Sequence, residues 1–524
     1  MWHRPSLLIA LNFLVLLLPW LVLPLPWASA EQMARGIVFH DKNGDQHFDE
    51  GDFPLGNIGV SNGREIVSTS ADGRFTLTID DDDIIFVLKP RGWRTPLNQE
   101  NLPRFFYIHK PKGSPKLKYP GVDPTGPLPD LIEFPLYPQK EPDQFRAILF
   151  GDPQPSDQKE VDYISRDVVS DLIGTDASFG VTLGDIVNDD LSLFGPLTQS
   201  IALIGIPWYN VIGNHDLNRV AKHDHHSDES FERVFGPNYY SFDYGPVHFL
   251  VLDDVIWENP DEGRPGYDGG LGADQMGFIR KDLARIPEDQ LVVLFMHIPL
   301  VDVEDRHELY RLIEMRPFCM SVAAHLHLHI HEFITAKDGW QGPQPHHHII
   351  NVTVSGSWWS GAPDERGIPH TTMADGAPNG YSIISFDGTR YQLQFRAAGR
   401  PAKYQMQIHA PDSLSQENLP FATVYANVFD GSERTKVEYS LGDGTWLEME
   451  KVLAIDPGYS RMVEHEAAVK DKNWNEISQP EISTHLWRTT LPTSLEPRSY
   501  VIQVKATDMH GVTHHGNHLI RVTP

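Results

Sequence analysis

The feature that most constrains this fold is a short apolar run that ends in a polar side chain, repeated five times. Each run has the length and composition of a buried strand. The polar residues after the runs are, in chain order, Asp152 with Gln154, Asp185, Asn214, His297, and His325 with His327. In open α/β sheets, ligands bind at the carboxyl ends of the strands. The sequence therefore predicts that these seven side chains form one functional site.

The chain of 524 residues is longer than one hydrophobic core usually organises, so we expect several domains. Helical patterns at 159–173 and 273–284 alternate with the apolar runs, which is typical of an α/β layer. After His331 the pattern becomes all-β, and these strands could form the second sheet of a two-sheet sandwich. We place this central domain at 144–400.

The flanking regions have the pattern of β domains. Residues 31–95 contain short strands separated by Asn-Gly and Asp-Gly turns, which predicts a small β-sandwich. Residues 96–143 are rich in Pro and Gly and are interpreted as a packed linker. Residues 401–416 are a polar linker, and 417–524 have the alternating strands of an immunoglobulin-like sandwich.

The first thirty residues have the composition of a targeting segment. Arg4 precedes the apolar run Leu7–Leu25, and Ala28-Ser29-Ala30 has the small-residue form of a cleavage site. A retained anchor is the alternative, because the run is long for a signal peptide. We expect a signal peptide over 1–30, cleavage after Ala30, and no membrane span in the mature chain. The expected location is the periplasm or the extracellular space, including association with the cell envelope.

Charge and cysteine content exclude several classes of function. A formal net charge of −28 disfavours nucleic acid as a partner, because it repels phosphate backbones. Cys319 is the single cysteine, so an intrachain disulfide and a zinc–thiolate site are excluded.

The seven polar residues have the chemistry of metal ligands. Carboxylate, amide and imidazole donors without thiolate suit Mn, Fe or Zn. Seven donors are too many for one ion, but a bridging Asp185 would divide them into two sets of four. Two ions about 3.5–4 Å apart can hold a bridging hydroxide and act on both oxygens of a phosphoryl displacement.

The motifs resemble those of the calcineurin-like metallophosphoesterases, and they occur in that family's order. They are Asp152-x-Gln154, Gly184-Asp185, Gly213-Asn214-His215-Asp216, His297 and His325-x-His327. The resemblance implies that 144–400 is a four-layer sandwich of two β-sheets flanked by helices. The flanking β domains are similar to those of a bacterial subgroup of the family.

The resemblance also implies a role for each motif residue. One metal ion would bind Asp152, Gln154, His327 and shared Asp185, and the second would bind Asp185, Asn214, His297 and His325. His215 would contact the phosphate together with Asn214 and protonate the leaving oxygen, and Asp216 would orient the His215 imidazole. Gln154 stands where the family more usually has histidine, which leaves the identity of the metals open.

An acid-rich turn in the first β domain has two interpretations. Its polar residues are Asp41, Asn43, Asp45, Asp49 and Asp52. Their spacing resembles the calcium-binding turn of cell-surface β-sandwich repeats. Gln46 stands where the helix–loop–helix calcium loop requires glycine. The turn either binds calcium or is a solvated acidic turn.

Several aromatic and histidine residues have no definite role in these motifs. Trp358 and Trp359, in the segment 355–361, either wall the substrate pocket or pack in the core. The turn-rich segment 370–380 is a second candidate for the rim of the site. We expect structural roles for His329 and His331, and a solvated loop for His223, His225 and His226.

The sequence thus predicts an exported metal-dependent phosphoesterase that attacks small phosphate esters with a metal-bridging hydroxide. A phosphomonoesterase is the first choice and a phosphodiesterase with the same site is the alternative. A second alternative is a cell-envelope binding protein in which the β domains perform the function.

Overall fold

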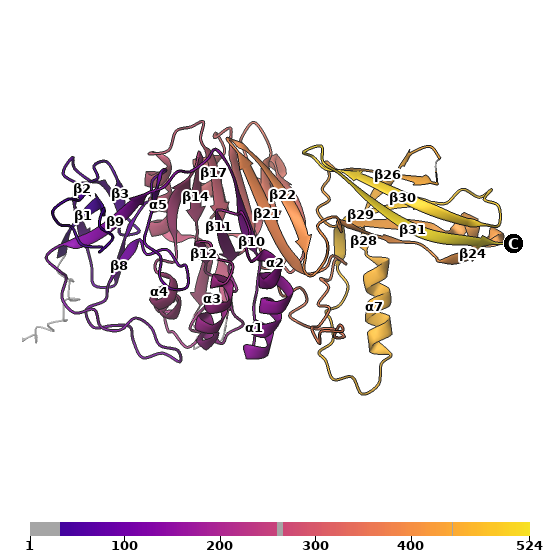
Figure 1. The fold of residues 1–524 in the computed structure, drawn as a ribbon, viewed down its shortest axis with the longest axis horizontal. Coiled ribbons are helices and arrows are strands. Elements are labelled where there is room, and N and C mark those ends of the chain that lie inside the picture. The colour runs from indigo at the N-terminus through magenta and orange to yellow at the C-terminus, as the bar shows by residue number, and fades with distance from the viewer. Residues whose placement is uncertain (1–31, 259–265, 443) are drawn as a thin grey trace, which may run out of the picture.

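The computed structural model describes residues 32–258, 266–442 and 444–524. The predicted signal peptide lies outside these residues. Within the described ranges, none of the helices has both the length and the apolar character required to cross a membrane. Three parts of the chain follow one another along the long axis of the molecule, and the C-terminal sheets lie at one end (Figure 1).

Two β-sheets form the centre of the molecule. The first has the strand order β12-β11-β10-β21-β22. Its strands are β10 (Gln144–Phe150), β11 (Phe179–Leu183), β12 (Trp208–Val211), β21 (Gly380–Asp387) and β22 (Arg390–Ala397). Strands β10, β11 and β12 are parallel neighbours, and β21 pairs with β10 in the antiparallel sense.

The second central sheet has the order β13-β14-β17-β18-β20-β19. Its strands are β13 (Tyr240–Tyr244), β14 (Val247–Val251), β17 (Leu291–Phe295), β18 (Cys319–Ala323), β19 (Ile330–Ile334) and β20 (His346–Ile350). Strands β14, β17, β18 and β20 are parallel neighbours. A hairpin of β15 (Val255–Glu258) and β16 (Gly266–Gly269) lies outside this sheet.

The two central sheets face each other across one hydrophobic core. The ring of Phe179 on β11 lies 5.3 Å from that of Phe249 on β14, and both residues are buried. Strands β11 and β17 are buried along their whole length, as expected for parallel strands that are covered on both faces.

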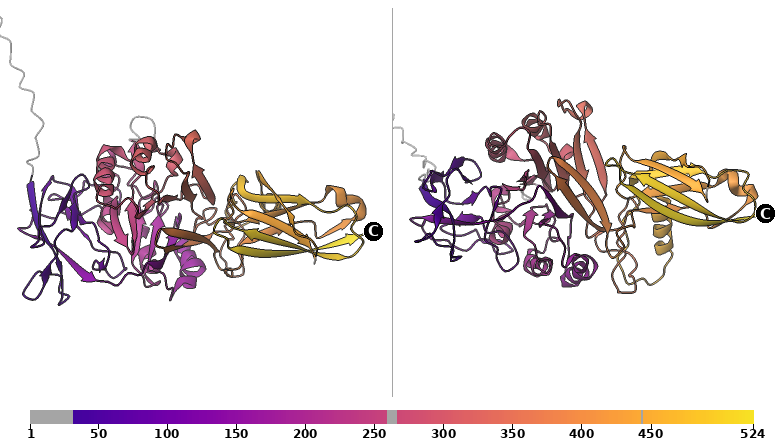
Figure 2. Two further views of the ribbon diagram at one scale, coloured as in Figure 1. Left: turned by 90° about the horizontal axis from the view of Figure 1, so that it is seen from above. Right: turned by 45° about the horizontal axis from the view of Figure 1, so that its top comes forward.

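Helices cover the outer faces of these sheets, as the right-hand view of Figure 2 shows. They are α1 (Gln158–Ile164), α2 (Ser170–Leu172), α3 (Phe194–Ala202), α4 (Glu229–Phe235), α5 (Gly272–Leu283) and α6 (Arg306–Ile313). The predicted multi-sheet, mixed α/β architecture is confirmed.

The N-terminal part contains two further sheets around their own core. The first comprises β1 (Gln32–His40), β2 (Phe53–Pro54), β5 (Arg74–Ile79), β7 (Trp93–Arg94) and β9 (Ile132–Pro138). The second comprises β3 (Gly59–Ser61), β4 (Ile66–Ser68), β6 (Asp83–Val87) and β8 (Phe106–His109). Both sheets contribute to one apolar cluster, which includes Val38 and Val60.

Part of the segment interpreted as a linker, 96–143, belongs to these sheets. Strand β8 pairs with β6, and β9 pairs in parallel with β1. Pro135 lies within β9, and proline inside a short apolar run weakens the sequence pattern of a strand. The partners of both strands are distant in sequence, so local composition did not indicate the pairing.

The C-terminal part is a pair of sheets with a shared core. One has the order β23-β25-β29-β28 and the other β24-β31-β30-β26-β27. The first comprises β23 (Met406–His409), β25 (Thr423–Val428), β28 (Glu450–Ile455) and β29 (Ile482–Thr490). The second comprises β24 (Ser413–Ser415), β26 (Lys436–Leu441), β27 (Leu447–Glu448), β30 (Ser499–Thr507) and β31 (Thr513–Thr523).

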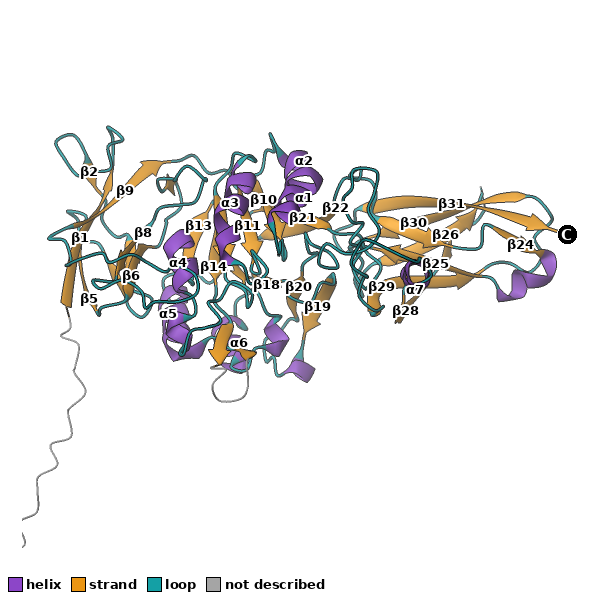
Figure 3. Cartoon of the chain, turned by 90° about the horizontal axis from the view of Figure 1, so that it is seen from below, coloured by secondary structure: helices purple, strands orange, loops and turns teal. Residues whose placement is uncertain are grey.

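Buried side chains from both C-terminal sheets, such as Val424 and Ile502, form one apolar cluster. The helix α7 (Pro457–Ala467) lies beside the first sheet, and loops fill the junction with the central domain (Figures 1 and 3).

Candidate metal centre

The seven predicted ligands lie just beyond strands of both central sheets. Asp152, Asp185 and Asn214 follow β10, β11 and β12, which belong to one sheet. His297 and His325 follow β17 and β18, which belong to the other. The site therefore forms where the carboxyl ends of strands from two facing sheets approach each other.

Backbone strain is concentrated at these residues. Five of the seven have a positive φ, a conformation that is uncommon for residues other than glycine. The values are 33° for Asp152, 43° for Gln154, 46° for Asp185, 70° for His325 and 54° for His327. Such conformations cost about 1–3 kcal/mol each and cluster at functional sites, where surrounding contacts maintain them.

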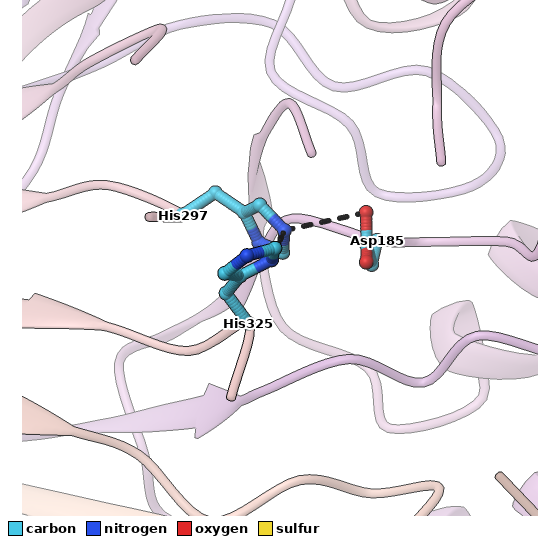
Figure 4. A group of neighbouring side chains, drawn as sticks. All are labelled: Asp185, His297 and His325. Carbon is cyan, nitrogen blue, oxygen red and sulfur yellow. Dashed lines mark hydrogen bonds and ion pairs between the residues drawn. The ribbon is translucent and has the colours of Figure 1, made fainter. Parts of the chain in front are cut away.

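Three of the ligands form the closest group. The ligand atoms of Asp185, His297 and His325 lie within 4.8 Å of one another, and Figure 4 shows their side chains converging. His297 Nε2 lies 3.3 Å from Asp185 Oδ1 and 3.1 Å from His325 Nδ1. It also lies 3.0 Å from Asn214 Oδ1, so four predicted ligands meet at this atom.

The other ring nitrogen of His297 fixes its tautomer. Nδ1 lies 2.9 Å from the carbonyl oxygen of Leu183, and a carbonyl can only accept, so Nδ1 carries a proton. His327 has the same arrangement, with Nδ1 at 2.5 Å from the carbonyl oxygen of Gly356. Metal-binding histidines usually donate their second ring N–H in this way, which directs the Nε2 lone pair to the ion.

Two buried oxygen atoms in the group have no hydrogen-bond partner among the described residues. They are Oδ1 of Asp152 and Oε1 of Gln154. The Gln154 side chain directs its amide nitrogen to Asp185 Oδ2 at 3.1 Å, which leaves Oε1 free. An unsatisfied buried polar atom costs about 1–3 kcal/mol, and a cation at this position would satisfy both oxygens. The residues present therefore fit the metal ions that the family resemblance implies.

The pKa directions agree with a dense, buried cluster of charge. Burial raises the pKa of Asp152 to about 8, and the neighbouring charge of Asp185 adds to the effect. Burial alone would lower the pKa of His297, but Asp185 and Asp152 raise it to about 10. Burial and the neighbouring charge of His297 together lower the pKa of His325 to about 3.

His215 lies beside this group and pairs with Asp189. Its Nδ1 lies 2.8 Å from Asp189 Oδ1, and its backbone N–H donates to Asp185 Oδ1 at 2.8 Å. Arg219 also contacts Asp189, at 2.9 Å. Burial lowers the pKa of His215, but the hydrogen bond to Asp189 and the charge of Asp185 raise it above its ordinary value.

The structure places the Asp216 carboxylate away from the His215 imidazole that it was predicted to orient. The Asp216 carboxylate turns into the protein, where it accepts hydrogen bonds from the backbone N–H groups of Gly213, Ile186 and Val187. These hydrogen bonds connect the two loops that carry Asp185 and Asn214. Among the described residues, none of the hydrogen bonds of Asp216 involves the His215 imidazole. The sequence signal that could have indicated Asp189 is its position, four residues after Asp185.

The two adjacent tryptophans have different environments. Trp359 is 3% exposed, and its indole N–H donates to the carbonyl oxygen of Pro153 at 3.0 Å. Trp358 is 45% exposed, and its ring stacks on His327 with centroids 4.0 Å apart. Trp359 is thus a core residue, whereas Trp358 presents an aromatic face to solvent beside the candidate centre.

The acidic turn of the N-terminal domain is closed by its own hydrogen bonds. Asp41 accepts from the backbone N–H groups of Gly44 and Gln46 and from the Tyr137 hydroxyl. The side-chain amide of Asn43 donates to Asp45 and Asp49, and Asp52 accepts from two backbone N–H groups. Calcium binding at this turn stays a prediction.

One further group, Asp82 with His226 and Glu229, also has ligand atoms close enough to hold an ion. The ammonium of Lys110 pairs with its carboxylates. This buried group lies 2.7 Å from Asp82 and 2.6 Å from Glu229, so one positive charge is shared between the two carboxylates. This group is therefore an ion-pair network that joins the N-terminal and central parts of the chain.

Comparison with known proteins gives matches at both ends of the chain. The family described as "N terminal of Calcineurin-like phosphoesterase" matches residues 42–119. The family described as "C terminal of Calcineurin-like phosphoesterase" matches residues 347–514.

Two curated proteins are similar over a shorter stretch. The human serine/threonine-protein phosphatase CPPED1 is 36% identical over 95 residues, and its Pongo abelii counterpart is 35% identical over 95 residues. The matched stretch covers 18% of this chain and 29% of the length of each relative. Among solved structures, a purple acid phosphatase from yellow lupin (Lupinus luteus) seeds has 13% identity and a TM-score of 0.34, and the match covers 70% of this chain and 66% of that one.

Proposed function

We propose that this chain, which belongs to the calcineurin-like metallophosphoesterase family, hydrolyses phosphate esters at a dinuclear metal centre. One observation carries the proposal. Nε2 of His297 lies within 3.3 Å of Asn214 Oδ1, His325 Nδ1 and Asp185 Oδ1. The raised pKa of His297 indicates that a proton sits among these atoms when no ion is bound, and a metal cation would replace that proton.

The ligand assignment follows the two sets implied by the motifs. One ion would be held by Asp152, Gln154, Asp185 and His327, and the other by Asp185, Asn214, His297 and His325. Bound ions of this kind, Mn, Fe or Zn, supply an activated water and stabilise charge on the phosphoryl oxygens. The strained backbone at five of these residues supports the assignment, because it holds the donors in place before an ion arrives.

His215 is the proposed proton donor to the leaving oxygen. Its Nδ1–H donates to Asp189, so the proton available to a substrate is on Nε2. The raised pKa favours the protonated imidazole, which is the form that general acid catalysis requires. Asp189 is the positioning residue in this pair, and Arg219 offsets its charge.

Trp358 is the proposed contact for the organic part of the substrate. An exposed indole face can stack on a flat group or a sugar. We expect phosphomonoesters to be the preferred class and phosphodiesters the alternative. The substrate is a small phosphate ester, and nucleic acid is disfavoured by the net charge of −28.

The flanking sheets support a multidomain enzyme of the cell envelope or extracellular space. The proposal of an immunoglobulin-like C-terminal sandwich is supported by the strand orders β23-β25-β29-β28 and β24-β31-β30-β26-β27, which can be aligned with ABED and GFC sheets. The cleavage motif Ala28-Ser29-Ala30 supports export. Mass measurement of protein recovered from the periplasm tests export, because a mature chain that starts at Glu31 is expected.

Hydrolysis of two model substrates tests the activity. Purified protein with Mn²⁺ is assayed against p-nitrophenyl phosphate and bis(p-nitrophenyl) phosphate, and faster turnover of the monoester is expected. The proposal would be contradicted if neither ester were hydrolysed by protein whose bound metal had been verified by elemental analysis. In the alternative of an envelope-binding protein, Asp185→Asn would leave function intact; the enzyme should lose both metal and activity.

A further inference from the structure

The segment that carries His325 and His327 continues directly into the junction with the C-terminal sandwich. His329 and His331 both direct Nε2 to one carboxylate oxygen of Asp430, at 3.0 Å and 2.8 Å. Asp430 lies just after β25, so it belongs to the C-terminal sandwich. All three residues have their side chains largely removed from solvent.

His329, His331 and Asp430 are close enough to hold a metal ion, but their hydrogen bonds exclude it. The backbone N–H of Val352 donates to Nδ1 of His329 at 3.1 Å, so this nitrogen carries the lone pair. The ring proton is therefore on Nε2, where it points to Asp430. An imidazole that bound an ion through Nε2 would place a proton on Nδ1, against the Val352 N–H. The group is a hydrogen-bonded clamp.

A second carboxylate holds the backbone of the same residue. Asp375 Oδ2 accepts the backbone N–H of His329 at 2.8 Å and pairs with Nε2 of His485 at 3.1 Å. His485 lies on β29 of the C-terminal sandwich, and both Asp375 and His485 are buried. Leu328 packs in a small apolar cluster with Tyr459 and Ile477 of the C-terminal part. The sandwich thus contacts this segment directly through Asp430 and through apolar side chains, and indirectly through His485, which pairs with Asp375.

The clamp lies next to the strained turn that presents two of the proposed metal ligands. His325 and His327 have φ values of 70° and 54°, so the turn that presents them is strained. Strain of this kind, about 1–3 kcal/mol per residue, persists only where the surroundings over-determine the conformation. Strand β18 fixes the turn at Ala323, and His329 fixes it two residues after His327.

We propose that the C-terminal sandwich positions the ligand turn 325–327 by clamping His329, and that this contact sets how tightly the centre retains its metal ions. Asp430 is the principal positioning residue. The inference rests on the metal centre of the proposed function, but it does not depend on the hydrolytic reaction.

The rate of metal release tests the clamp. Zn²⁺-loaded full-length protein is mixed with excess of a chromophoric chelator, and the release rate is followed by absorbance. Loss of residues that orient metal ligands typically weakens metal binding about 10- to 100-fold, so Asp430→Ala should release an ion faster by a factor in that range. Asp430→Asn keeps one acceptor oxygen and should give an intermediate rate.

Glu466→Gln is the matched control. Glu466 on α7 forms an ion pair with His370 of the central domain at 2.8 Å, and it makes no hydrogen bond to the segment 325–331. This variant also removes a buried interdomain charge, but it should leave metal release within about twofold of wild type, because the site is independent of the clamp.

Three results would contradict the proposal that the clamp controls metal retention. They are an unchanged release rate in folded Asp430→Ala, an equal acceleration in Glu466→Gln, and wild-type protein that binds no ion. If circular dichroism shows that Asp430→Ala is unfolded, the test uses Asp430→Asn instead. A metal-release rate of Asp430→Asn equal to that of Glu466→Gln would contradict the inference. Protein that binds metal and shows the expected rates without hydrolysing any phosphate ester would contradict the proposed function alone.

Discussion

Two groups of histidine and carboxylate side chains lie on neighbouring parts of the chain and differ in how their polar atoms are satisfied. Asp185, His297 and His325 form one, and His329, His331 and Asp430 form the other. Both have ligand atoms within 4.8 Å of one another. In the first, Nε2 of His297 faces Asn214 Oδ1 and His325 Nδ1, and the adjacent oxygens of Asp152 and Gln154 lack hydrogen-bond partners among the described residues. In the second, two imidazole N–H groups point at one carboxylate.

This difference shows that residue type and proximity do not define a metal site. A metal site is defined by ligand atoms that remain available after the other hydrogen bonds of the group have formed. In the first group, His297 donates its Nδ1–H to a backbone carbonyl, so Nε2 is the ring nitrogen that can bind an ion. His329 instead accepts a backbone N–H and donates its proton to Asp430, so its hydrogen bonds are complete without an ion.

The largest expected effect comes from breaking the first group. Asp185→Asn removes the carboxylate shared by both proposed ions, so elemental analysis should show loss of bound metal. Activity on p-nitrophenyl phosphate should fall at least about 10³-fold, beyond the 10- to 100-fold typical of residues that only orient ligands. Asp430→Asn, assayed at saturating metal, is the matched change in the second group and should retain most activity. Equal losses in the two variants would contradict the distinction.

Asp189 and Asp216 test which carboxylate assists His215. Asp189→Asn should lower kcat about 10²-fold for a poor leaving group such as phenol, because the imidazole loses the partner that keeps it protonated. The loss should be smaller for p-nitrophenol, which leaves without a proton. Metal content should not change.

Asp216→Asn should act mainly on stability. It replaces an acceptor of three backbone N–H groups, so the free energy of unfolding should fall by about 1–3 kcal/mol in urea denaturation. If Asp216→Asn removed the leaving-group dependence and Asp189→Asn did not, the assignment of Asp189 would be contradicted.

The two tryptophans give a smaller effect on binding. Aromatic stacking contributes about 0.5–1.5 kcal/mol, so Trp358→Ala should raise KM for an aryl phosphate about 2- to 12-fold with little change in stability. Trp359→Ala should instead lower the free energy of unfolding by about 3–5 kcal/mol, because it empties a buried volume. Measurement of KM and of the denaturation midpoint for both variants separates the roles, and an unchanged KM in Trp358→Ala would remove it from the substrate site.

A third group, whose hydrogen bonds are complete without an ion, gives an effect that depends on pH. His248 lies between Asp243 at 2.8 Å and Asp282 at 3.0 Å. Burial alone would lower its pKa, but the two carboxylates raise the pKa of His248 to about 10. Because the unfolded value is about 6.5, the stabilisation is complete below that pH and is lost as pH rises towards 10. Wild-type stability should therefore fall more steeply between pH 7 and pH 10 than that of His248→Gln, and parallel curves would contradict the ion pairing.

The sequence indicated the first group because its signal is local. An apolar strand followed at once by Asp185 or His297 can be recognised without knowledge of the fold. The two central sheets could be predicted for the same reason, since each strand has its own apolar run. The residues that hold the ligands in place were missed because their partners are distant in sequence: Asp430 lies 101 residues after His329.

Side-chain direction in the loops also could not be predicted. Asp216 adjoins His215 in sequence, but the turn directs its carboxylate to backbone N–H groups and leaves Asp189 beside the imidazole. Similarly, Trp358 and Trp359 are adjacent, yet one is exposed and the other is buried. Strands β8 and β9 were missed because they pair with strands that precede the interpreted linker.

Anomalous diffraction from crystals grown with Mn²⁺ tests the central distinction most directly. Two anomalous peaks are expected among the seven proposed ligands, with Asp185 contacting both ions. These ligands are Asp152, Gln154, Asp185, Asn214, His297, His325 and His327. No peak is expected between His329, His331 and Asp430. A peak at the second group, or none at the first, would contradict the distinction.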